Sequence, residues 1–542
     1  MLQAFHWFLD SNYPSSNGRN LLQFLKDEAD HLRSIGVDAV WIPPVYKAAG
    51  GKSSVGYDVH DHYDTGEFPV SNPNNTKYGT TQQLANAVNA LHGNGTNKRI
   101  DVYADIVLNH KAGGDQDDFW WAVRVDKENR THRRTEPGFE SGPLEIIGYT
   151  RFDHADRNGT YSNFTWSTRH FDSVDTAAAL RQDGNEFNEA PDKYIYLYTY
   201  NEAGFVPHEK NFERWVSLEK GNYDYLTSCD FDYGRPDVRE EMKAWGEWFV
   251  NKFGFDGVRL DAVKHISGNY IREWVGHVRH KAQRQLFAVG EYIEGNTQRL
   301  HDYLDNITHE GEFPQEITLF DFPLFFRFRE VSYAGENFDL RNLFSGTLQQ
   351  ERPTSAVTFV ENHDYEYGRA FNSHVKTWFK PLAYAFILLR EGGYPCVFFP
   401  DYYGSVNVGD HTAYPDGSEY LTLLMHTRKQ FALGAEVNYT DGDIAGWVRL
   451  GFVPNAKGAM SVVINTAFNR IRSIRMNTGR RSVRFKHYAT IKWTNDRYTT
   501  IMGRNTAYGL NEEEVWTDND GWGDFLAEGG SVAIWTEETS LT

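Results

Sequence analysis

The sequence predicts an α/β protein built on a (β/α)8 TIM barrel, with one domain inserted after the third strand and an antiparallel β-sandwich at the C-terminus. Strand-like and helix-like segments alternate over residues 1–110 and 223–436, and eight such strands are enough to close a barrel. Residues 111–222 interrupt this rhythm with segments rich in Asp, Asn, Arg, Gly and Thr, which indicates the inserted domain. Over residues 437–542, short alternating strands with glycine turns predict the β-sandwich, whose expected role is to cover the barrel.

The first elements follow from periodicity and from capping signals. Apolar residues with helical spacing between Asn20 and Ile35 predict a helix that ends at Gly36. Thr80 and Gln83 have the spacing of a capping box ahead of a helix at 81–92. We expect the first three strands at 1–9, 38–45 and 99–110, and the loop at 46–79 is long enough to be a functional loop.

The alternation resumes after the inserted domain. Strands are expected at 256–262, 287–293, 316–323, 356–362 and 396–402, and helices at 236–252, 270–284, 297–305, 375–390 and 418–433. Cys229 and Cys396 are the only two cysteines and fall in separate expected barrel strands. A disulfide framework is therefore not expected, which agrees with a reducing compartment without requiring one.

Charge and composition limit the possible partners. The net charge of −19 and the pI near 5.5 argue against nucleic acids and anionic membranes, because both need an excess of Lys and Arg. The aromatic content of 15% suits core packing first, and stacking on neutral sugar faces second. The start MLQAFHWFL lacks the features of a signal peptide, so we expect a cytoplasmic location, although a secreted chain with a trimmed signal stays open. We also expect a monomer.

Three carboxylates stand where expected strands run out into loops. These are Asp261, Glu291 and Asp364, and the C-terminal strand ends of a parallel barrel converge on one mouth. Arg259 lies two residues before Asp261, so the two side chains project to the same side of their strand. A buried ion pair that joins two strands would explain Arg259 and Asp261 alone. The two further acids favour a polar site at the mouth.

A pair of carboxyl groups on neighbouring strands suits glycosidic bond cleavage. A retaining enzyme needs a nucleophile and a general acid about 5–5.5 Å apart, and adjacent strands lie about 4.8 Å apart. Arg259 is expected to keep Asp261 ionised, and Glu291 is expected to have less cationic surroundings so that it can hold a proton. His110 and His363 could donate to sugar hydroxyls, although single histidines are more often structural, and Tyr57 could stack on a sugar ring.

Four ordered motifs resemble the signature segments of the α-amylase family of glycoside hydrolases, family 13. They are DIVLNH (105–110), GVRLDAVKH (257–265), GEY (290–292) and FVENHD (359–364). GYDVHDHYDTGEF, NYDYLTSCDFDY, WFKPLAYAFIL and GWGDFLAEGGSVAIW resemble the liquefying and intracellular branch. The resemblance covers nearly the whole chain. It implies endo-acting, retaining hydrolysis of internal α-1,4 bonds in starch- or glycogen-type α-glucans and malto-oligosaccharides.

The resemblance also implies a role for each residue in the motifs. Asp261 would be the nucleophile, Glu291 the general acid/base, and Asp364 the carboxylate that binds and distorts the sugar. Arg259, His110, His363 and Tyr57 would complete the first subsite, with Lys264 and His265 on the leaving-group side. Two other activities stay open. One is a 4-α-glucanotransferase, because a sugar hydroxyl can intercept a glycosyl-enzyme, and the other is an inactive glucan-binding protein.

The resemblance further implies Ca²⁺ between the barrel and the inserted domain. Asn109, Asp224, Asp230 and the backbone oxygen of His265 would supply the hard oxygen ligands that Ca²⁺ prefers. Asp172 and Asp232 match positions that serve an adjoining metal cluster in this branch. A solvated acidic face would be the alternative. Because Glu213 stands where relatives carry Asp, a single Ca²⁺ is favoured over a full cluster with a second metal ion nearby.

Overall fold

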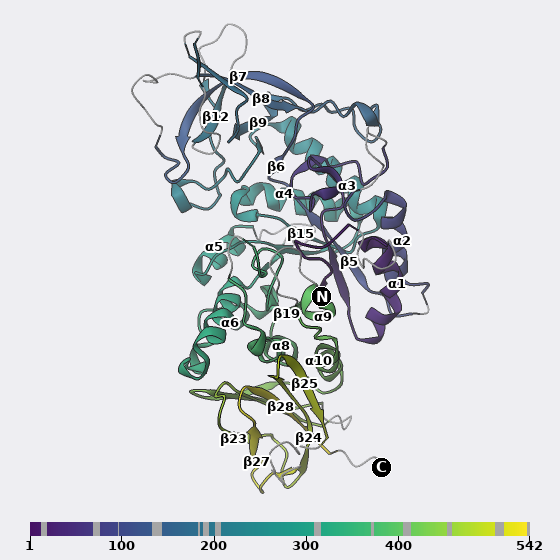
Figure 1. Ribbon diagram of the computed structural model, residues 1–542, viewed down its shortest axis with the longest axis vertical. Coiled ribbons are helices and arrows are strands. Elements are labelled where there is room, and N and C mark those ends of the chain that lie inside the picture. The colour runs from purple at the N-terminus through teal and green to yellow at the C-terminus, as the bar shows by residue number, and fades with distance from the viewer. Residues whose placement is uncertain are drawn as a thin grey trace.

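The computed structural model describes residues 1–11, 19–68, 76–95, 97–132, 144–182, 185–187, 194–200, 208–307, 316–369, 373–404, 414–452, 458–503 and 514–538. Three layers of structure follow one another along the longest axis (Figure 1). A β-rich region coloured blue lies at one end, the barrel lies in the middle, and a β-rich C-terminal region lies at the other end. The described residues contain no helix that is long and apolar enough to cross a membrane.

Eight strands form the closed barrel that the sequence predicts. Their order around the barrel is β1-β19-β18-β17-β16-β15-β5-β2, and every neighbouring pair is parallel. The strands are β1 (Leu2–Gln3), β2 (Ala39–Ile42), β5 (Asp101–Ile106), β15 (Gly257–Leu260), β16 (Phe287–Gly290), β17 (Thr318–Phe320), β18 (Ala356–Phe359) and β19 (Tyr394–Phe398). Most of their residues are buried, as expected for parallel strands covered on both faces.

Helices surround the barrel, and two of them begin at a capping box. Asn20 and Thr80 each form a capping box with the Gln three residues later, ahead of α1 and α2. Gly254 ends α3 in the left-handed region, with φ of 72°, which glycine tolerates without steric cost. The helices are α1 (Leu21–Ser34), α2 (Thr81–His92), α3 (Pro236–Phe253), α4 (Gly268–Ala282), α5 (Thr297–Ile307), α6 (Phe322–Ala334), α7 (Leu348–Glu351), α8 (Lys380–Leu389) and α10 (Ser418–Gln430).

Three details of the expected element order were wrong. The strand expected at 396–402 ends at Phe398, and residues Phe399–Tyr403 form helix α9, with Pro400 near its start. Helix α6 was not expected, because its apolar residues occur on most of its faces and show no clear helical stripe. Cys229 lies in β14 (Cys229–Phe231), which pairs with β6 and β9 and not with the barrel. Both cysteines are buried and free.

The region after β5 contains an antiparallel sheet of nine strands, ordered β11-β10-β8-β7-β12-β9-β14-β6 with β13 beside β12. The strands are β6 (His110–Lys111), β7 (Gln116–Asp126), β8 (Leu144–Arg151), β9 (Phe171–Val174), β10 (Ala179–Gln182), β11 (Asn185–Phe187), β12 (Tyr194–Tyr200), β13 (His208–Glu209) and β14. β6 begins four residues after β5 ends, so this sheet rises from the carboxyl end of the barrel (Figure 1). The domain boundaries at 110 and 222 stay a prediction.

A short hairpin in the long loop also lies at this end. It pairs β3 (Lys47–Ala48) with β4 (Val59–Asp61), and Ala112 just after β6 donates its backbone N–H to the carbonyl oxygen of Val59. The loop that precedes β4 is therefore attached to the inserted sheet as well as to the barrel.

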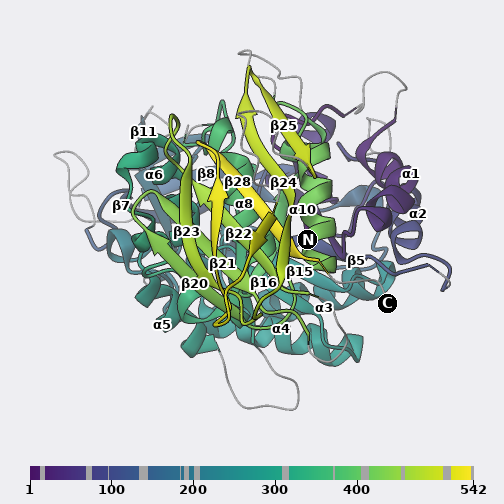
Figure 2. The same ribbon diagram turned by 90° about the horizontal axis from the view of Figure 1, so that it is seen from below.

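The C-terminal region packs on the opposite end of the barrel. Figure 2, seen from below, shows its strands lying across the barrel helices. They form one sheet of seven strands and one of two, β23 with β27, which share an apolar core. The strands are β20 (Glu436–Asp441), β21 (Ile444–Arg449), β22 (Met460–Asn465), β23 (Arg472–Asn477), β24 (Arg484–Thr494), β25 (Arg497–Met502), β26 (Glu514–Trp516), β27 (Trp522–Ala527) and β28 (Ser531–Glu537). Trp447 stacks on Phe386 of α8, which joins the two regions.

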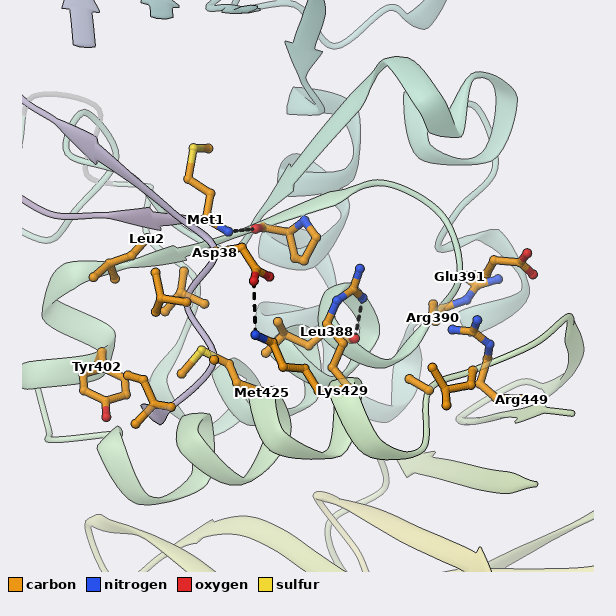
Figure 3. A pocket seen from close by; sticks show the side chains of 18 residues that line it. Met1, Leu2, Asp38, Leu388, Arg390, Glu391, Tyr402, Met425, Lys429 and Arg449 are labelled. Atoms are coloured by element: carbon orange, nitrogen blue, oxygen red, sulfur yellow. Dashed lines mark hydrogen bonds and ion pairs between the residues drawn. The ribbon is translucent and has the colours of Figure 1, made fainter. Parts of the chain in front are cut away.

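A cavity of about 280 Å³ lies at the amino ends of β1, β2 and β19 (Figure 3). Its polar groups pair with one another. The Met1 amine donates to the carbonyl oxygen of Pro395 at 2.9 Å, and the Lys429 ammonium lies 3.1 Å from the Asp38 carboxylate. These contacts fasten the start of the barrel to α10, so we read this cavity as structural.

Candidate active site

A cavity of about 780 Å³ opens at the carboxyl end of the barrel, beside the inserted sheet. Its wall includes all three carboxylates and five of the six substrate-binding residues that the sequence predicts. These are Asp261, Glu291, Asp364, Tyr57, His110, Lys264, His265 and His363. The sixth residue, Arg259, is 1% exposed and lies behind the wall. The predicted residues therefore meet at one mouth, as the parallel barrel requires.

The Arg259 guanidinium connects three carboxylates from neighbouring strands. Its Nη1 lies 2.8 Å from Asp105 Oδ1 and 2.7 Å from Asp261 Oδ1, and its Nη2 lies 2.9 Å from Glu291 Oε2. The strand register explains the first contact, because Arg259 on β15 stands directly opposite Asp105 on β5. Asp261 and Glu291 follow the last residues of β15 and β16, so both reach the same guanidinium.

Glu291 has two oxygens with different surroundings. Oε2 accepts the backbone N–H of Ala262 at 3.2 Å as well as the Arg259 contact. Oε1 is buried and makes no hydrogen bond with any described residue. It is therefore the oxygen on which a proton can reside and be delivered to a bound ligand.

The expectation that Glu291 has less cationic surroundings than Asp261 was wrong, because Arg259 contacts both carboxylates. Burial nevertheless raises the pKa of Glu291, and the Arg259 charge opposes that rise. Burial also raises the pKa of Asp261; the Arg259 charge opposes this rise and so favours the ionised form, as expected, while the Glu291 and Asp105 charges add to the rise. Burial raises the pKa of Asp105 to about 6. One guanidinium faces three acids, so full ionisation of all three is unfavourable and a proton is retained.

Aromatic rings form the wall beside the acids. The Tyr57 and His363 rings are nearly parallel, with centroids 5.2 Å apart, and the Trp7 ring is parallel to Tyr57 at 6.2 Å. The Tyr57 hydroxyl donates to Asp105 Oδ2 at 3.0 Å, which ties this wall to the Arg259 cluster. Asp364 contacts Arg369 at 3.3 Å, and the Arg369 guanidinium lies over the Trp7 ring.

The remaining predicted residues line the side nearest the inserted sheet. His110 Nε2 donates to the carbonyl oxygen of Tyr57 at 2.9 Å, and its Nδ1 has no partner among the described residues. His265 Nδ1 donates to the carbonyl oxygen of Tyr223 at 2.7 Å. Burial lowers the pKa of His110, and it lowers the pKa of His265 to about 3, so both rings are neutral. Lys264 donates to the carbonyl oxygen of Ile293 at 2.9 Å and pairs with Glu219.

Sequence reasoning missed several residues of this site. Asp105 opens the motif DIVLNH and is a charged residue inside an expected buried strand, so its position alone could have indicated a role. Trp7 and Arg369 lie on the cavity wall without any motif that marks them. Glu219 precedes the segment NYDYLTSCDFDY and was not distinguished from other surface acids.

Acidic oxygens gather where the inserted sheet meets the barrel. One carboxylate oxygen from each of Asp172, Asp224 and Asp230 lies within 4.8 Å of the others. Asn109 Nδ2 donates to Asp230 Oδ1 at 2.7 Å. Three buried oxygens have no hydrogen-bond partner among the described residues, namely Asn109 Oδ1, Asp172 Oδ2 and Asp230 Oδ2. Burial raises the pKa of Asp172 to about 7 and also raises the pKa of Asp230. An all-oxygen set with unpaired buried carboxylates fits a hard divalent cation.

Asp232 differs from these residues because it already has a cationic partner. The Lys210 ammonium lies 3.0 Å from Asp232 Oδ2 and donates to the carbonyl oxygens of Arg169 and Phe171, each at 2.6 Å. Glu213 accepts the backbone N–H groups of Tyr233 at 2.9 Å and Ser267 at 3.1 Å. The Asp232 Oδ2 atom makes no hydrogen bond with a described residue, but the nearby Lys210 ammonium compensates its charge. Both oxygens of Glu213 accept backbone N–H groups.

Comparisons with known proteins agree with this geometry. The family described as "Alpha amylase, catalytic domain" matches residues 9–139 and 209–430. An α-amylase of Geobacillus stearothermophilus is 37% identical over 99% of this chain and 86% of its own length, and a cytoplasmic α-amylase of Escherichia coli is 34% identical over 99% and 98%. A solved α-amylase of Geobacillus thermoleovorans, complexed with acarbose, has the same fold, with a TM-score of 0.58 at 16% identity over 96% of this chain and 92% of its own. The chain belongs to the α-amylase family of glycoside hydrolases.

Proposed function

We propose that this protein is an endo-acting α-amylase that hydrolyses internal α-1,4 bonds of starch- or glycogen-type glucans with retention of configuration. The observation that carries the proposal is that Asp261 and Glu291 lie together on the wall of a cavity of about 780 Å³. Both contact the same guanidinium, that of Arg259, which lies behind the wall. A cavity of that volume falls within the usual range for small-molecule ligands, about 300–1,000 Å³.

In the first step, Asp261 attacks the anomeric carbon while Glu291 protonates the glycosidic oxygen, from the Oε1 atom that has no partner among the described residues. The C–O bond to the leaving chain breaks and a glycosyl ester forms on Asp261. In the second step, Glu291 takes a proton from water, the water oxygen attacks the anomeric carbon, and the ester bond breaks to release Asp261. Arg259 balances the negative charge that returns to Asp261.

The other wall residues position the sugar in this proposal. Asp364 binds sugar hydroxyls beside the aromatic wall of Tyr57, Trp7 and His363, which is apolar enough to cover a sugar face. Lys264 and His265 lie toward the inserted sheet, where they contact the leaving side of the glucan.

We also propose that the protein works as a monomer in the cytoplasm. The Escherichia coli relative with the printed name "Cytoplasmic alpha-amylase" supports this location, because it is similar over 99% of this chain and 98% of its own length.

Maltopentaose digestion tests the reaction class. We expect chromatography to reveal only oligosaccharides shorter than the substrate, because water intercepts the glycosyl ester. Oligosaccharides longer than maltopentaose would instead indicate a 4-α-glucanotransferase, and binding without any product would indicate an inactive glucan-binding protein.

Asp261→Asn should lower kcat on soluble starch by on the order of 10⁴-fold or more, since the nucleophile is lost. The exposed Asp302→Asn is the matched control, and an Asp261→Asn rate near one tenth of wild type would contradict the assigned role.

Arg259→Lys tests the shared guanidinium. Lysine keeps the charge but cannot contact Asp105, Asp261 and Glu291 with one planar fork, so we expect kcat to fall on the order of 100-fold or more. Arg449→Lys is the control, because Arg449 is buried and donates to carbonyl oxygens far from the mouth. It should lower the melting temperature while leaving kcat unchanged. Equal kcat values for the two variants would argue against the role of Arg259.

The raised pKa of Glu291 predicts a pH-dependent stability effect. A carboxyl whose pKa is higher in the folded chain stabilises the fold below its unfolded pKa, about 4.3, and this contribution is lost as pH rises through the folded pKa. Glu291→Gln should therefore raise the melting temperature relative to wild type more at pH 8 than at pH 4. The control Glu330→Gln changes an exposed carboxylate and should give the same small difference at both pH values. A Glu291→Gln difference independent of pH would contradict the raised pKa.

We propose one structural Ca²⁺ at the interface of the barrel and the inserted sheet. Asn109, Asp224, Asp230, the backbone oxygen of His265 and Asp172 would hold it, supported by the three unpaired buried oxygens. When bound, the ion would neutralise these carboxylates and join Asn109 of the barrel mouth to the inserted sheet. We do not assign Asp232 to a second metal ion, because the Lys210 ammonium already compensates its charge.

Chelation tests the Ca²⁺ proposal. Excess EDTA should lower the melting temperature, because Ca²⁺ at ~100 times its Kd stabilises the folded chain by about 2.7 kcal/mol. Calorimetric titration should give one bound Ca²⁺. Asp230→Asn should remove this binding, whereas Asp232→Asn should keep it, since Asp232 is paired with Lys210. An unchanged melting curve in EDTA, or a stoichiometry of two, would contradict the proposal.

A further inference from the structure

We propose that His60, Asp115 and one ring nitrogen of His154 form a binding site for a transition-metal ion of the Zn²⁺ type, separate from the proposed Ca²⁺ site. One potential ligand atom from each of the three side chains lies within 4.8 Å of the other two. They come from β4, from the segment before β7, and from the turn before the short helix at Ala155–Arg157.

The hydrogen bonds of His60 leave one nitrogen free for a metal. Its Nδ1 lies 2.8 Å from the carbonyl oxygen of Gly113, and a carbonyl can only accept, so Nδ1 carries the proton. Nε2 then presents its lone pair, 3.3 Å from Asp115 Oδ1. A metal-bound histidine commonly donates its other ring N–H to a carbonyl oxygen in this way. The separation of Nε2 and Oδ1 suits two donors on one ion, since Zn–N and Zn–O bonds are about 2.0–2.2 Å.

His154 gives the independent indication of a ligand. The residue is 7% exposed, and neither ring nitrogen has a hydrogen-bond partner among the described residues. Asp61 Oδ2 lies 3.6 Å from His154 Nδ1, too far for a hydrogen bond, and Arg157 Nε already donates to that oxygen at 2.6 Å. Burial lowers the pKa of His154 well below its ordinary value, so the ring is neutral and can donate a lone pair. A buried imidazole without partners is costly, and a metal ion would remove that cost.

Backbone hydrogen bonds orient the Asp115 carboxylate so that one oxygen faces His60. Its Oδ2 accepts the backbone N–H of Asp153 at 2.9 Å and that of His154 at 3.3 Å, which leaves Oδ1 toward His60. These backbone bonds favour the ionised form of the Asp115 carboxylate. An ionised carboxylate with one free oxygen is a suitable third ligand.

The surrounding charge favours a cation. The site adjoins a cavity of about 180 Å³, whose wall carries five aspartates, one lysine and one arginine, namely Asp61, Asp64, Asp115, Asp153, Asp156, Lys47 and Arg157. Arg157 is paired with Asp61, and Lys47 lies 3.7 Å from Asp156. Lys111 is the opposing charge. Its ammonium donates to the carbonyl oxygen of His60, and burial lowers its pKa to about 8.

Two imidazoles and one carboxylate distinguish this site from the oxygen cluster. Imidazole nitrogen suits Zn²⁺, Cu²⁺, Ni²⁺ and Fe²⁺, whereas Ca²⁺ takes oxygen ligands. A bound ion would join strand β4 of the hairpin in the long barrel loop to two segments of the inserted region. Tyr57 of the active-site wall lies three residues before His60 in this loop. We therefore expect the ion to hold the wall of the active-site cavity, and not to take part in the reaction.

Metal titration of the full chain tests this proposal. Chelator-treated protein would be reloaded with Ca²⁺ and titrated with Zn²⁺ by calorimetry, and with Co²⁺ by visible absorption. We expect one equivalent of Zn²⁺ that excess Ca²⁺ does not displace, a rise in melting temperature, and the strong visible bands of tetrahedral Co²⁺. His60→Gln and His154→Gln should each weaken Zn²⁺ binding on the order of 100-fold or more. The control His280→Gln removes an exposed histidine of α4 and should change neither affinity nor stoichiometry.

The outcomes separate the possibilities. Uptake of no Zn²⁺ by the Ca²⁺-loaded wild type, or equal uptake by the His60→Gln and His154→Gln variants, would overturn the proposal. His154→Phe guards against a folding defect, because it replaces the unpaired imidazole by an apolar ring and should raise the melting temperature without metal. Loss of the Zn²⁺-dependent rise in that variant would support the site. Octahedral Co²⁺ spectra from the wild type would indicate loose surface binding and count against it.

Discussion

The guanidinium of Arg259 is the group around which the mouth of the barrel is arranged. It joins the ends of β5, β15 and β16 through Asp105, Asp261 and Glu291. Because closure of the barrel fixes the register of these strands, the three acids cannot separate without breaking strand pairing. Without the guanidinium, three buried carboxyl groups would lack a counterion, which is strongly destabilising. The same contact thus stabilises the fold and sets the protonation of the proposed catalytic pair.

A short piece of chain connects this cluster to both proposed metal sites. Asp105, the next-to-last residue of β5, contacts the guanidinium, Asn109 contacts Asp230, and Lys111 in β6 donates to the carbonyl oxygen of His60. Residues 105–111 therefore lead from the Arg259 cluster to the inserted sheet within seven residues. A cation at either place would act on catalysis through the position of this segment, and through Tyr57, whose carbonyl oxygen accepts from His110.

Much of the fold and of the site could be predicted from the sequence, because parallel strands leave a readable pattern. The barrel strands are apolar runs, and Asp261, Glu291 and Asp364 follow three of them. The carboxyl ends of these strands meet at the mouth of the barrel, so the three acids line one cavity. The surroundings of Glu291 could not be predicted, since they depend on which way a guanidinium on the adjacent strand is turned. Trp7 and Arg369 stack on each other across a large sequence separation, and neither carries a local signal.

The ammonium of Lys210 is a cation that is covalently attached to the protein, unlike a bound metal ion. Its ammonium lies among two carbonyl oxygens and the Asp232 carboxylate, a set of acceptors that would also suit a dissolved ion. A tethered charge cannot dissociate, so dilution or a chelator leaves it in place. This part of the inserted region therefore keeps its charges compensated at any concentration of free metal.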